Sequence, residues 1–213
     1  MTMNAHMELL MQRYPALEVC RADIEAAVAA LIACYEQGGK LLLCGNGGSC
    51  ADCDHITGEL MKGFLKKRPL SEAEQTAMRE QCPALETNTL QKLQKGLPAV
   101  PLTAMAGLFT AFCNDVDPAL VYAQQLLALG KPGDVLLGIS TSGNAENVAA
   151  AAKVAKALGL TVIGLTGEKG GVLATLADIA VRVPETETYK VQELHLPVYH
   201  GLCAAVEEHF FET

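Results

Sequence analysis

The sequence predicts an α/β protein built on a doubly wound, five-stranded parallel sheet flanked by helices. Short β-branched or aliphatic runs alternate with longer amphipathic stretches, which is the pattern of parallel strands joined by crossover helices. Half of the residues are hydrophobic while only 5% are aromatic and Trp is absent, so Ala, Leu, Val and Gly must form most of the interior. A chain of 213 residues suits one core, and residues 1–213 are expected to form a single domain.

Helices are expected at both ends of the chain and between the strands. Apolar residues recur at helical spacing from Glu18 to Glu36, and N-terminal helices are expected over residues 3–37. Ala145 to Leu158 is rich in alanine, and Tyr189 to Phe211 closes the chain with a further helical pattern. Five runs are predicted to be strands, in chain order: Lys40 to Cys44, Ala99 to Thr103, Asp134 to Ile139, Thr161 to Leu165 and Asp178 to Val183.

Residues 66–97 interrupt this alternation. Ser71 and Glu74 have the spacing of a capping box and Pro83 marks a break, so two short helices are predicted. The segment contains no chemical motif. We interpret it as a helical insertion that either covers a pocket mouth, makes a subunit contact or is a solvated excursion.

Charge and cysteine usage exclude several classes of protein. The 24 acidic and 16 basic side chains give a formal charge of -8, which argues against binding of nucleic acid or an anionic membrane surface. No apolar run has the length of a membrane span, and Met1 to Arg13 does not resemble a signal peptide, so a cytoplasmic location is expected. The eight cysteines are spread through predicted strands and helices, which favours free thiols.

Two polar, glycine-containing loops follow the first and third predicted strands, and each lies immediately before a helix. In doubly wound sheets ligands bind at this edge, where glycines allow close approach and hydroxyls and unpaired amides bind anions. Alternatively, Ser49 with Asp52, and Ser142 or Asn144, cap the helices that follow. Two such loops together favour a phosphate site. The expected phosphate-binding residues are Asn46, Gly47, Gly48, Ser49, Ser140, Thr141, Ser142 and Asn144.

Other loop chemistries fail on spacing. The dinucleotide fingerprint needs a third glycine where this chain has Cys50, and no Gly-Lys-Ser/Thr triplet marks a P-loop, so no nucleotide cofactor is predicted. Gly138 to Ser142 lacks the second glycine of a hydrolase elbow. Cys50-x-x-Cys53 has redox or zinc spacing, but on a helix Cys53 and His55 lie about 200° apart. We interpret these cysteines as small core or wall residues.

With these loops, His55-x-x-x-Glu59, Gln192-Glu193-Leu194-His195 and His200, the chain resembles the phosphoheptose isomerases of the sugar-isomerase (SIS) family. The resemblance covers nearly all of the chain except Lys66 to Gly96. It implies a flavodoxin-like strand order, a cytoplasmic homotetramer and aldose-ketose isomerisation of a phosphorylated sugar through an enediol. The implied substrate is sedoheptulose 7-phosphate, and the implied product is D-glycero-D-manno-heptose 7-phosphate.

The resemblance also implies a metal-assisted site. Its zinc ligands would be His55, Glu59, Gln192 and His200. Glu59 would be the base, His200 the acid, and Gln192 would also contact substrate. Residues four apart share a helix face, so His55 and Glu59 can converge. Periodicity alone does not choose the last two ligands, because His200 is nearer in phase to Glu193 than to Gln192, and His195 is also within reach.

Two other functions remain open at this level. A non-catalytic SIS protein would bind a protein partner, but those relatives lack the second histidine that this chain has at His200. An isomerase or sensor of another sugar phosphate would share the same motifs. The chain departs from the family pattern at Ala145, where another serine is usual, at Met105 after the second strand, and at Pro197 within the last helix.

Overall fold

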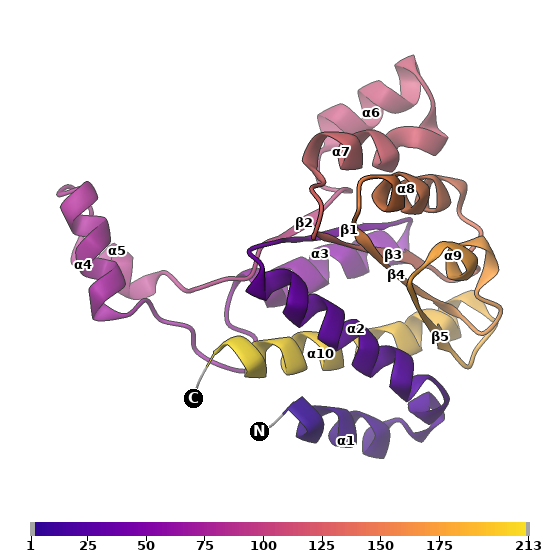
Figure 1. The fold of residues 1–213 in the computed structure, drawn as a ribbon, viewed down its shortest axis with the longest axis horizontal. Coiled ribbons are helices and arrows are strands. Elements are labelled where there is room, and N and C mark those ends of the chain that lie inside the picture. The colour runs from indigo at the N-terminus through magenta and orange to yellow at the C-terminus, as the bar shows by residue number, and fades with distance from the viewer. Residues whose placement is uncertain (1–2, 212–213) are drawn as a thin grey trace.

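In the computed structural model, which describes residues 3–211, the sheet has five parallel strands in the order β2-β1-β3-β4-β5 (Figure 1). This arrangement confirms the predicted doubly wound sheet and its flavodoxin-like order. The observed bounds lie close to the predicted ones, although β2 ends two residues early. The strands are β1 (Leu41–Gly45), β2 (Ala99–Pro101), β3 (Val135–Ser140), β4 (Thr161–Gly167) and β5 (Ile179–Val183).

Helices surround this sheet, with η marking the 3-10 helices. The predicted helix from Glu18 to Glu36 is two elements, because Pro15 opens a 3-10 helix and the α-helix begins at Arg21. The described helices are α1 (Met3–Arg13), η1 (Pro15–Cys20), α2 (Arg21–Glu36), α3 (Gly48–Met61), α4 (Glu72–Gln81), α5 (Thr87–Lys92), α6 (Ala106–Asp115), η2 (Pro118–Leu120), α7 (Val121–Leu129), α8 (Glu146–Ala157), α9 (Gly171–Leu176) and α10 (Thr188–Phe210).

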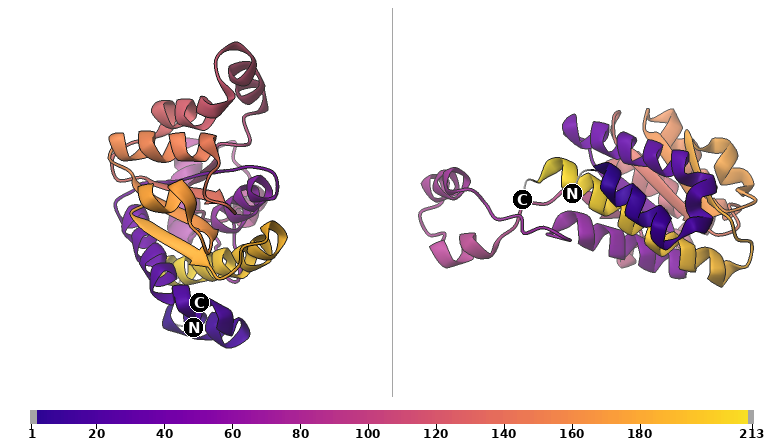
Figure 2. Two further views of the ribbon diagram at one scale, coloured as in Figure 1. Left: turned by 90° about the vertical axis from the view of Figure 1, so that its right-hand side faces the viewer. Right: turned by 90° about the horizontal axis from the view of Figure 1, so that it is seen from below.

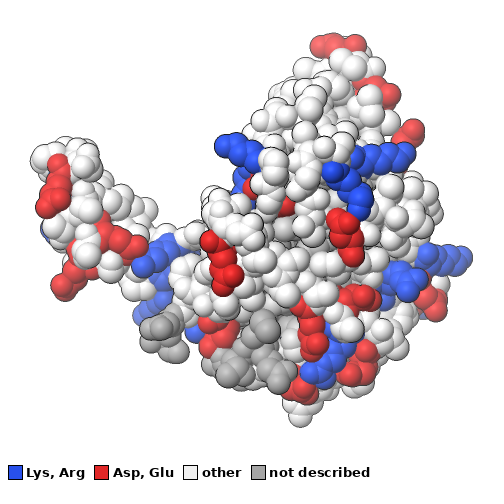
Figure 3. Space-filling view, viewed as in Figure 1, with Lys and Arg blue, Asp and Glu red and all other residues white. Residues whose placement is uncertain are grey.

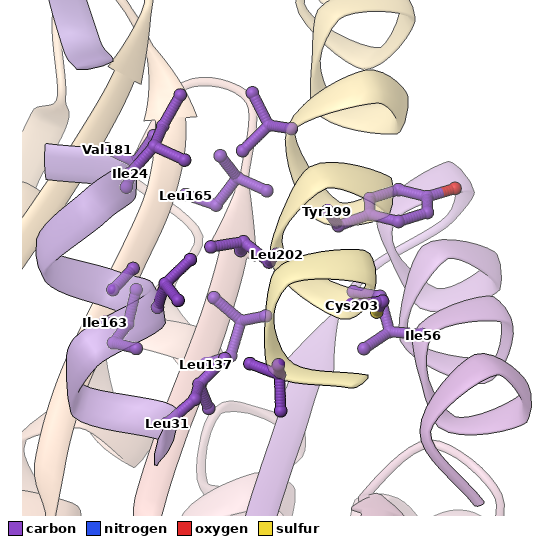
Figure 4. Packing of buried hydrophobic residues seen from close by; sticks show 14 of the residues in the cluster. Ile24, Leu31, Ile56, Leu137, Ile163, Leu165, Val181, Tyr199, Leu202 and Cys203 are labelled. Atoms are coloured by element: carbon purple, nitrogen blue, oxygen red, sulfur yellow. The ribbon is translucent and has the colours of Figure 1, made fainter. Parts of the chain in front are cut away.

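Side chains alternate between two apolar layers on either side of the sheet. Leu41 and Leu43 of β1 face a core formed with α2, α3 and α10, whereas Leu42 and Cys44 face a second core with α7, α8 and α9. Burying apolar side chains contributes about 1.5–3 kcal/mol each, so both layers stabilise the fold. Figure 4 shows α10 lying between α2 and α3 in the first core. This packing brings the first crossover helix beside the last helix.

The last helix continues through Pro197. A proline inside a helix removes one backbone donor and usually kinks or ends the helix. Here the next residues, Val198 and Tyr199, are buried in the core between the sheet and α3, and this packing offsets the lost hydrogen bond. His200 is therefore presented from a helix that is held on its buried side.

The insertion forms two short helices, α4 and α5, that stand away from the body of the protein (Figures 1 and 2). The predicted capping box is present, because the Ser71 side chain accepts a hydrogen bond from the Glu74 amide and the Glu74 carboxylate accepts one from the Ser71 amide. The base of the insertion is closed by a bridge between Pro69 and Gln94. Among the described residues, none of α4 is buried, so this helix remains open to solvent.

Acidic and basic side chains are interspersed over the face drawn in Figure 3. Among residues 3–211, no helix has both the length and the apolar character needed to cross a membrane. The eight cysteines, all within the described residues, are free thiols.

Candidate active site

The two glycine-containing loops meet where β1 and β3, which are neighbours in the sheet, reach their carboxyl ends. They line a pocket of about 370 Å³. Gly47 has a φ of +57°, a conformation that glycine adopts without strain, and α3 begins at the next residue. The helix amino terminus therefore faces the pocket, where the positive end of the helix dipole favours an anion. Of the predicted phosphate-binding residues, the lining includes Asn46, Gly47, Gly48, Ser49, Ser140, Thr141 and Ser142.

Gln192 belongs to this pocket as well. A Cβ placed on residue 48 would lie 2.4 Å from Nε2 of Gln192, so the glycine makes room for the amide. Gln192 and His200 are eight residues apart on α10, which corresponds to about 12 Å along the helix axis. The structure therefore places Gln192 with the phosphate loops, and His200 two turns further along.

The side chains of Asn46, in the first loop, and Asn147, the second residue of α8, form a reciprocal amide pair. Asn46 donates from Nδ2 to Oδ1 of Asn147 at 2.8 Å, and Asn147 donates back at 3.0 Å. The Tyr122 hydroxyl donates to the Gly45 carbonyl at 2.6 Å and so holds the start of the first loop. Asn144 does not line the pocket; its Oδ1 accepts from the Val172 amide at 3.1 Å. These contacts fix the spacing of the pocket walls.

Three of the four predicted metal ligands come together between α3 and α10. Nε2 of His55 lies 3.3 Å from Oε1 of Glu59 and 3.5 Å from Nε2 of His200. Glu59 is mostly buried, and the ammonium of Lys62 lies 3.5 Å from its Oε2. Burial lowers the pKa of His200, and neighbouring His55 lowers it further. A carboxylate and two imidazoles thus share one small volume.

Two further side chains lie behind His55. Nδ1 of His55 is 3.0 Å from the Tyr199 hydroxyl, and that hydroxyl donates to Oδ1 of Asp52 at 3.2 Å. Burial raises the pKa of Asp52, although the hydrogen bond from Tyr199 and the nearby His55 oppose the shift. Burial also raises the pKa of Tyr199, helped by the Asp52 charge.

The donor types at this cluster suit a divalent metal. In a tetrahedral zinc site with bonds of about 2.0 Å, ligand atoms lie about 3.3 Å apart, close to the separations of 3.3 and 3.5 Å around His55. Among the described residues, however, no three His, Cys, Asp or Glu side chains close on one point as a complete metal site. The cluster therefore fits a metal through its donor types and through the two contacts of His55.

A buried ion pair is hydrogen-bonded to the backbone of Glu59. Arg68 and Glu207 are both completely buried and form a salt bridge at 2.8 Å. Arg68 also donates to the backbone carbonyls of Glu59 and Leu60, at 3.1 and 2.7 Å. The end of α3 is thereby fastened to the end of α10. The partners are 139 residues apart, so no local sequence pattern indicates this contact.

Two other candidates from the sequence lie outside the cluster. His195 is completely buried, and burial lowers its pKa to about 4, although the Thr166 backbone opposes the shift. Cys53 is buried in the first core, and burial raises its pKa well above the usual value, which disfavours a reactive thiolate. This burial agrees with the interpretation of Cys53 as a small core residue.

Comparison with known proteins fits this geometry. Residues 15–95 and 94–167 match the model of the SIS domain family, and the chain belongs to that family. Phosphoheptose isomerase of Burkholderia pseudomallei (strain 1710b) is 40% identical over 190 residues, which cover 89% of this chain and 83% of the relative. That of Roseiflexus sp. (strain RS-1) is 37% identical, with 92% and 90% covered.

Solved structures of phosphoheptose isomerases also superpose on this chain. Phosphoheptose isomerases from Neisseria gonorrhoeae and Francisella tularensis superpose with TM-scores of 0.73 and 0.75, each at 32% identity and with 96% of both chains covered. Within the SIS domain family, the chain is a member of the phosphoheptose isomerases, a group of aldose-ketose isomerases.

Proposed function

We propose that this enzyme interconverts sedoheptulose 7-phosphate and D-glycero-D-manno-heptose 7-phosphate. The observation that carries the proposal is the position of the Glu59, His55 and His200 cluster, which lies along the same two helices as the glycine-loop pocket. The pocket would take the phosphate and the cluster would act on the carbonyl end. The similarity to phosphoheptose isomerases supplies the identity of the sugar.

The phosphate would be bound by neutral donors. Ser49, Ser140, Thr141 and Ser142 would supply hydroxyls, and the positive end of the α3 dipole faces the same pocket. Gln192 adds a side-chain amide against Gly48. Ala145 also lines the pocket, where a serine would have offered one more donor. Because a neutral hydrogen bond contributes about 0.5–1.5 kcal/mol, its absence weakens phosphate binding without abolishing it.

Glu59 and His200 would divide the proton transfers. Glu59 removes the proton from C1 of the ketose, and the electron pair forms the C1–C2 double bond of an enediolate. His200 delivers a proton from its ring N–H to C2 from the other side, while the hydroxyl proton of O1 moves to O2 and C1 becomes the aldehyde.

A divalent metal would be held by His55, Glu59 and His200. We propose that this metal is zinc. Gln192, the fourth ligand expected from the family resemblance, would instead serve the phosphate pocket, because it packs against Gly48. When bound, such an ion polarises a carbonyl oxygen and stabilises the negative charge that develops there.

We also propose that the enzyme is a cytoplasmic homotetramer. A cavity of about 440 Å³ lies beside His200 between α1 and α10, and apolar side chains at its rim, Leu9, Leu65 and Leu196, are exposed. A neighbouring subunit would cover this surface and complete the surroundings of His200. Light scattering at micromolar concentration tests the assembly, and a monomer would contradict it.

The function is tested by incubating the purified protein with sedoheptulose 7-phosphate in D₂O and following the products by NMR. The proposal predicts an aldoheptose 7-phosphate that carries deuterium at C2, because the proton on His200 exchanges with solvent. A panel of other ketose and aldose phosphates separates this activity from isomerisation of a different sugar. Absence of turnover with every member of the panel would contradict the proposal and favour a non-catalytic, partner-binding SIS protein.

A further inference from the structure

The two ring nitrogens of His55 face different neighbours. Nε2 lies toward Glu59 and His200, at 3.3 and 3.5 Å, while Nδ1 lies 3.0 Å from the Tyr199 hydroxyl. A neutral imidazole carries its proton on one nitrogen and a lone pair on the other. The position of that proton therefore decides whether His55 offers a donor or a lone pair to the reactive cluster.

The hydrogen bond from Tyr199 to Asp52 determines which partner donates between Tyr199 and His55. A tyrosine hydroxyl has a single proton, which it keeps at neutral pH. That hydroxyl lies 3.2 Å from Oδ1 of Asp52, and a carboxylate accepts but cannot donate. The Tyr199 proton is thus directed to Asp52, and the oxygen lone pairs face His55. Nδ1 of His55 must then be the donor.

Burial keeps this chain of hydrogen bonds in place. Tyr199 is only 1% exposed, and its ring extends from α10 toward α3 in the first core (Figure 4). The other oxygen of Asp52, Oδ2, is buried and has no hydrogen-bond partner within residues 3–211. If Tyr199 turned away, the part-buried Asp52 carboxylate would lose the hydrogen bond to its Oδ1, and loss of a partner at a buried group costs about 1–3 kcal/mol.

We propose that Asp52 and Tyr199 are positioning residues that hold His55 as its Nδ1–H tautomer, so that a bare Nε2 faces Glu59 and His200. The role given to that cluster rests on the proposed function, whereas the tautomer follows from the hydrogen bonds alone. A bare nitrogen beside a carboxylate is suited to a cation. Hydrogen-bond partners behind a histidine orient its ring and raise its basicity as a ligand. Asp52 and Tyr199 would serve His55 in this way.

The direct test is the tautomer of His55, read before any zinc is added from nitrogen-proton correlation NMR of the full-length protein labelled with ¹⁵N-histidine. Wild type should show a protonated Nδ1 and an unprotonated Nε2 at His55. Tyr199→Phe, which keeps the ring but removes the hydroxyl, should lose this preference. The matched control is Tyr35→Phe, because the Tyr35 hydroxyl is also part-buried and donates to a backbone carbonyl, that of Pro98, in a different part of the core. This control should leave the His55 signals unchanged.

Zinc affinity, measured by competition with a chelator, gives a second readout. Tyr199→Phe and Asp52→Ala should weaken binding about 10- to 100-fold. Asp52→Asn should weaken it less, because the amide oxygen can still accept from Tyr199. The inference would be overturned if His55 of the wild type carried its proton on Nε2. It would also be overturned if His55 of Tyr199→Phe kept the same tautomer as the wild type. If wild type shows the expected tautomer but isomerises no sugar phosphate, the proposed function fails and the positioning role stands.

Discussion

Glu207 accepts a hydrogen bond from Nε of Arg68 at 2.8 Å, and neither side chain is exposed to solvent. The same carboxylate accepts the backbone N–H groups of Phe64, Leu65 and Lys66 at 2.9, 2.7 and 3.1 Å. One side chain near the end of α10 therefore organises the turn that follows α3. That turn comes directly after the helix that carries His55 and Glu59.

Replacing Glu207 with Leu should destabilise the protein strongly. The substitution leaves the Arg68 guanidinium buried without its charge partner, and removal of one member of a buried pair costs about 3–5 kcal/mol. Urea unfolding measures the difference. The matched control is Glu187→Ala, which breaks an exposed pair with Lys190 and should cost less than about 1 kcal/mol. Equal losses in the two variants would show that the buried pair has no special role.

The amide pair between Asn46 and Asn147 predicts an effect on substrate affinity. In Asn147→Ala the first phosphate loop loses the hydrogen bonds that join it to the start of α8, each worth about 0.5–1.5 kcal/mol. The KM for the sugar phosphate should rise roughly 2- to 10-fold with little change in kcat, because Asn147 contacts the phosphate loop and not the Glu59, His55 and His200 cluster. Steady-state kinetics checks this. Asn114→Ala, at an exposed position of α6, is the control, and a similar KM in both variants would contradict the role of the pair.

The burial of His195 predicts that the protein loses stability in mild acid. The unfolded chain binds a proton at this residue below pH about 6.5, whereas the folded chain, with a pKa of about 4, stays neutral. The unfolded state therefore binds more protons between these values, and stability falls as pH falls. From pH 7 to pH 5, wild type should lose about 2 kcal/mol more than His195→Leu. Denaturant unfolding at both pH values measures this difference, and parallel losses would be inconsistent with a neutral, buried His195.

Local patterns were sufficient to predict the sheet. Strand positions followed from aliphatic runs such as Leu41 to Cys44, and the phosphate loops followed from glycines and hydroxyls directly after two of those runs. The capping box of Ser71 and Glu74 is an equally local signal, and the structure contains it. These features depend on residues that are close in the chain.

The supporting contacts of the site could not be predicted in that way. Asn46 and Asn147 are 101 residues apart, and Tyr199 and Asp52 are 147 apart, so no periodicity connects them. Gln192 was assigned to the metal by resemblance, whereas in the structure its amide packs against Gly48. Its position depends on how α10 lies beside α3, which the sequence of either helix alone does not specify.

Glu59→Gln provides the most direct test of the account, measured as turnover of sedoheptulose 7-phosphate beside wild type and Ser142→Ala. The amide keeps the size of the side chain but cannot take the C1 proton, so kcat should fall at least about 100-fold while substrate affinity is largely retained. Ser142→Ala should instead raise KM with kcat nearly unchanged, because the phosphate is bound in both ground and transition states. Thermal melting and zinc content are measured on each variant. A folded Glu59→Gln protein with wild-type turnover would contradict the assignment of the base and most of the mechanism.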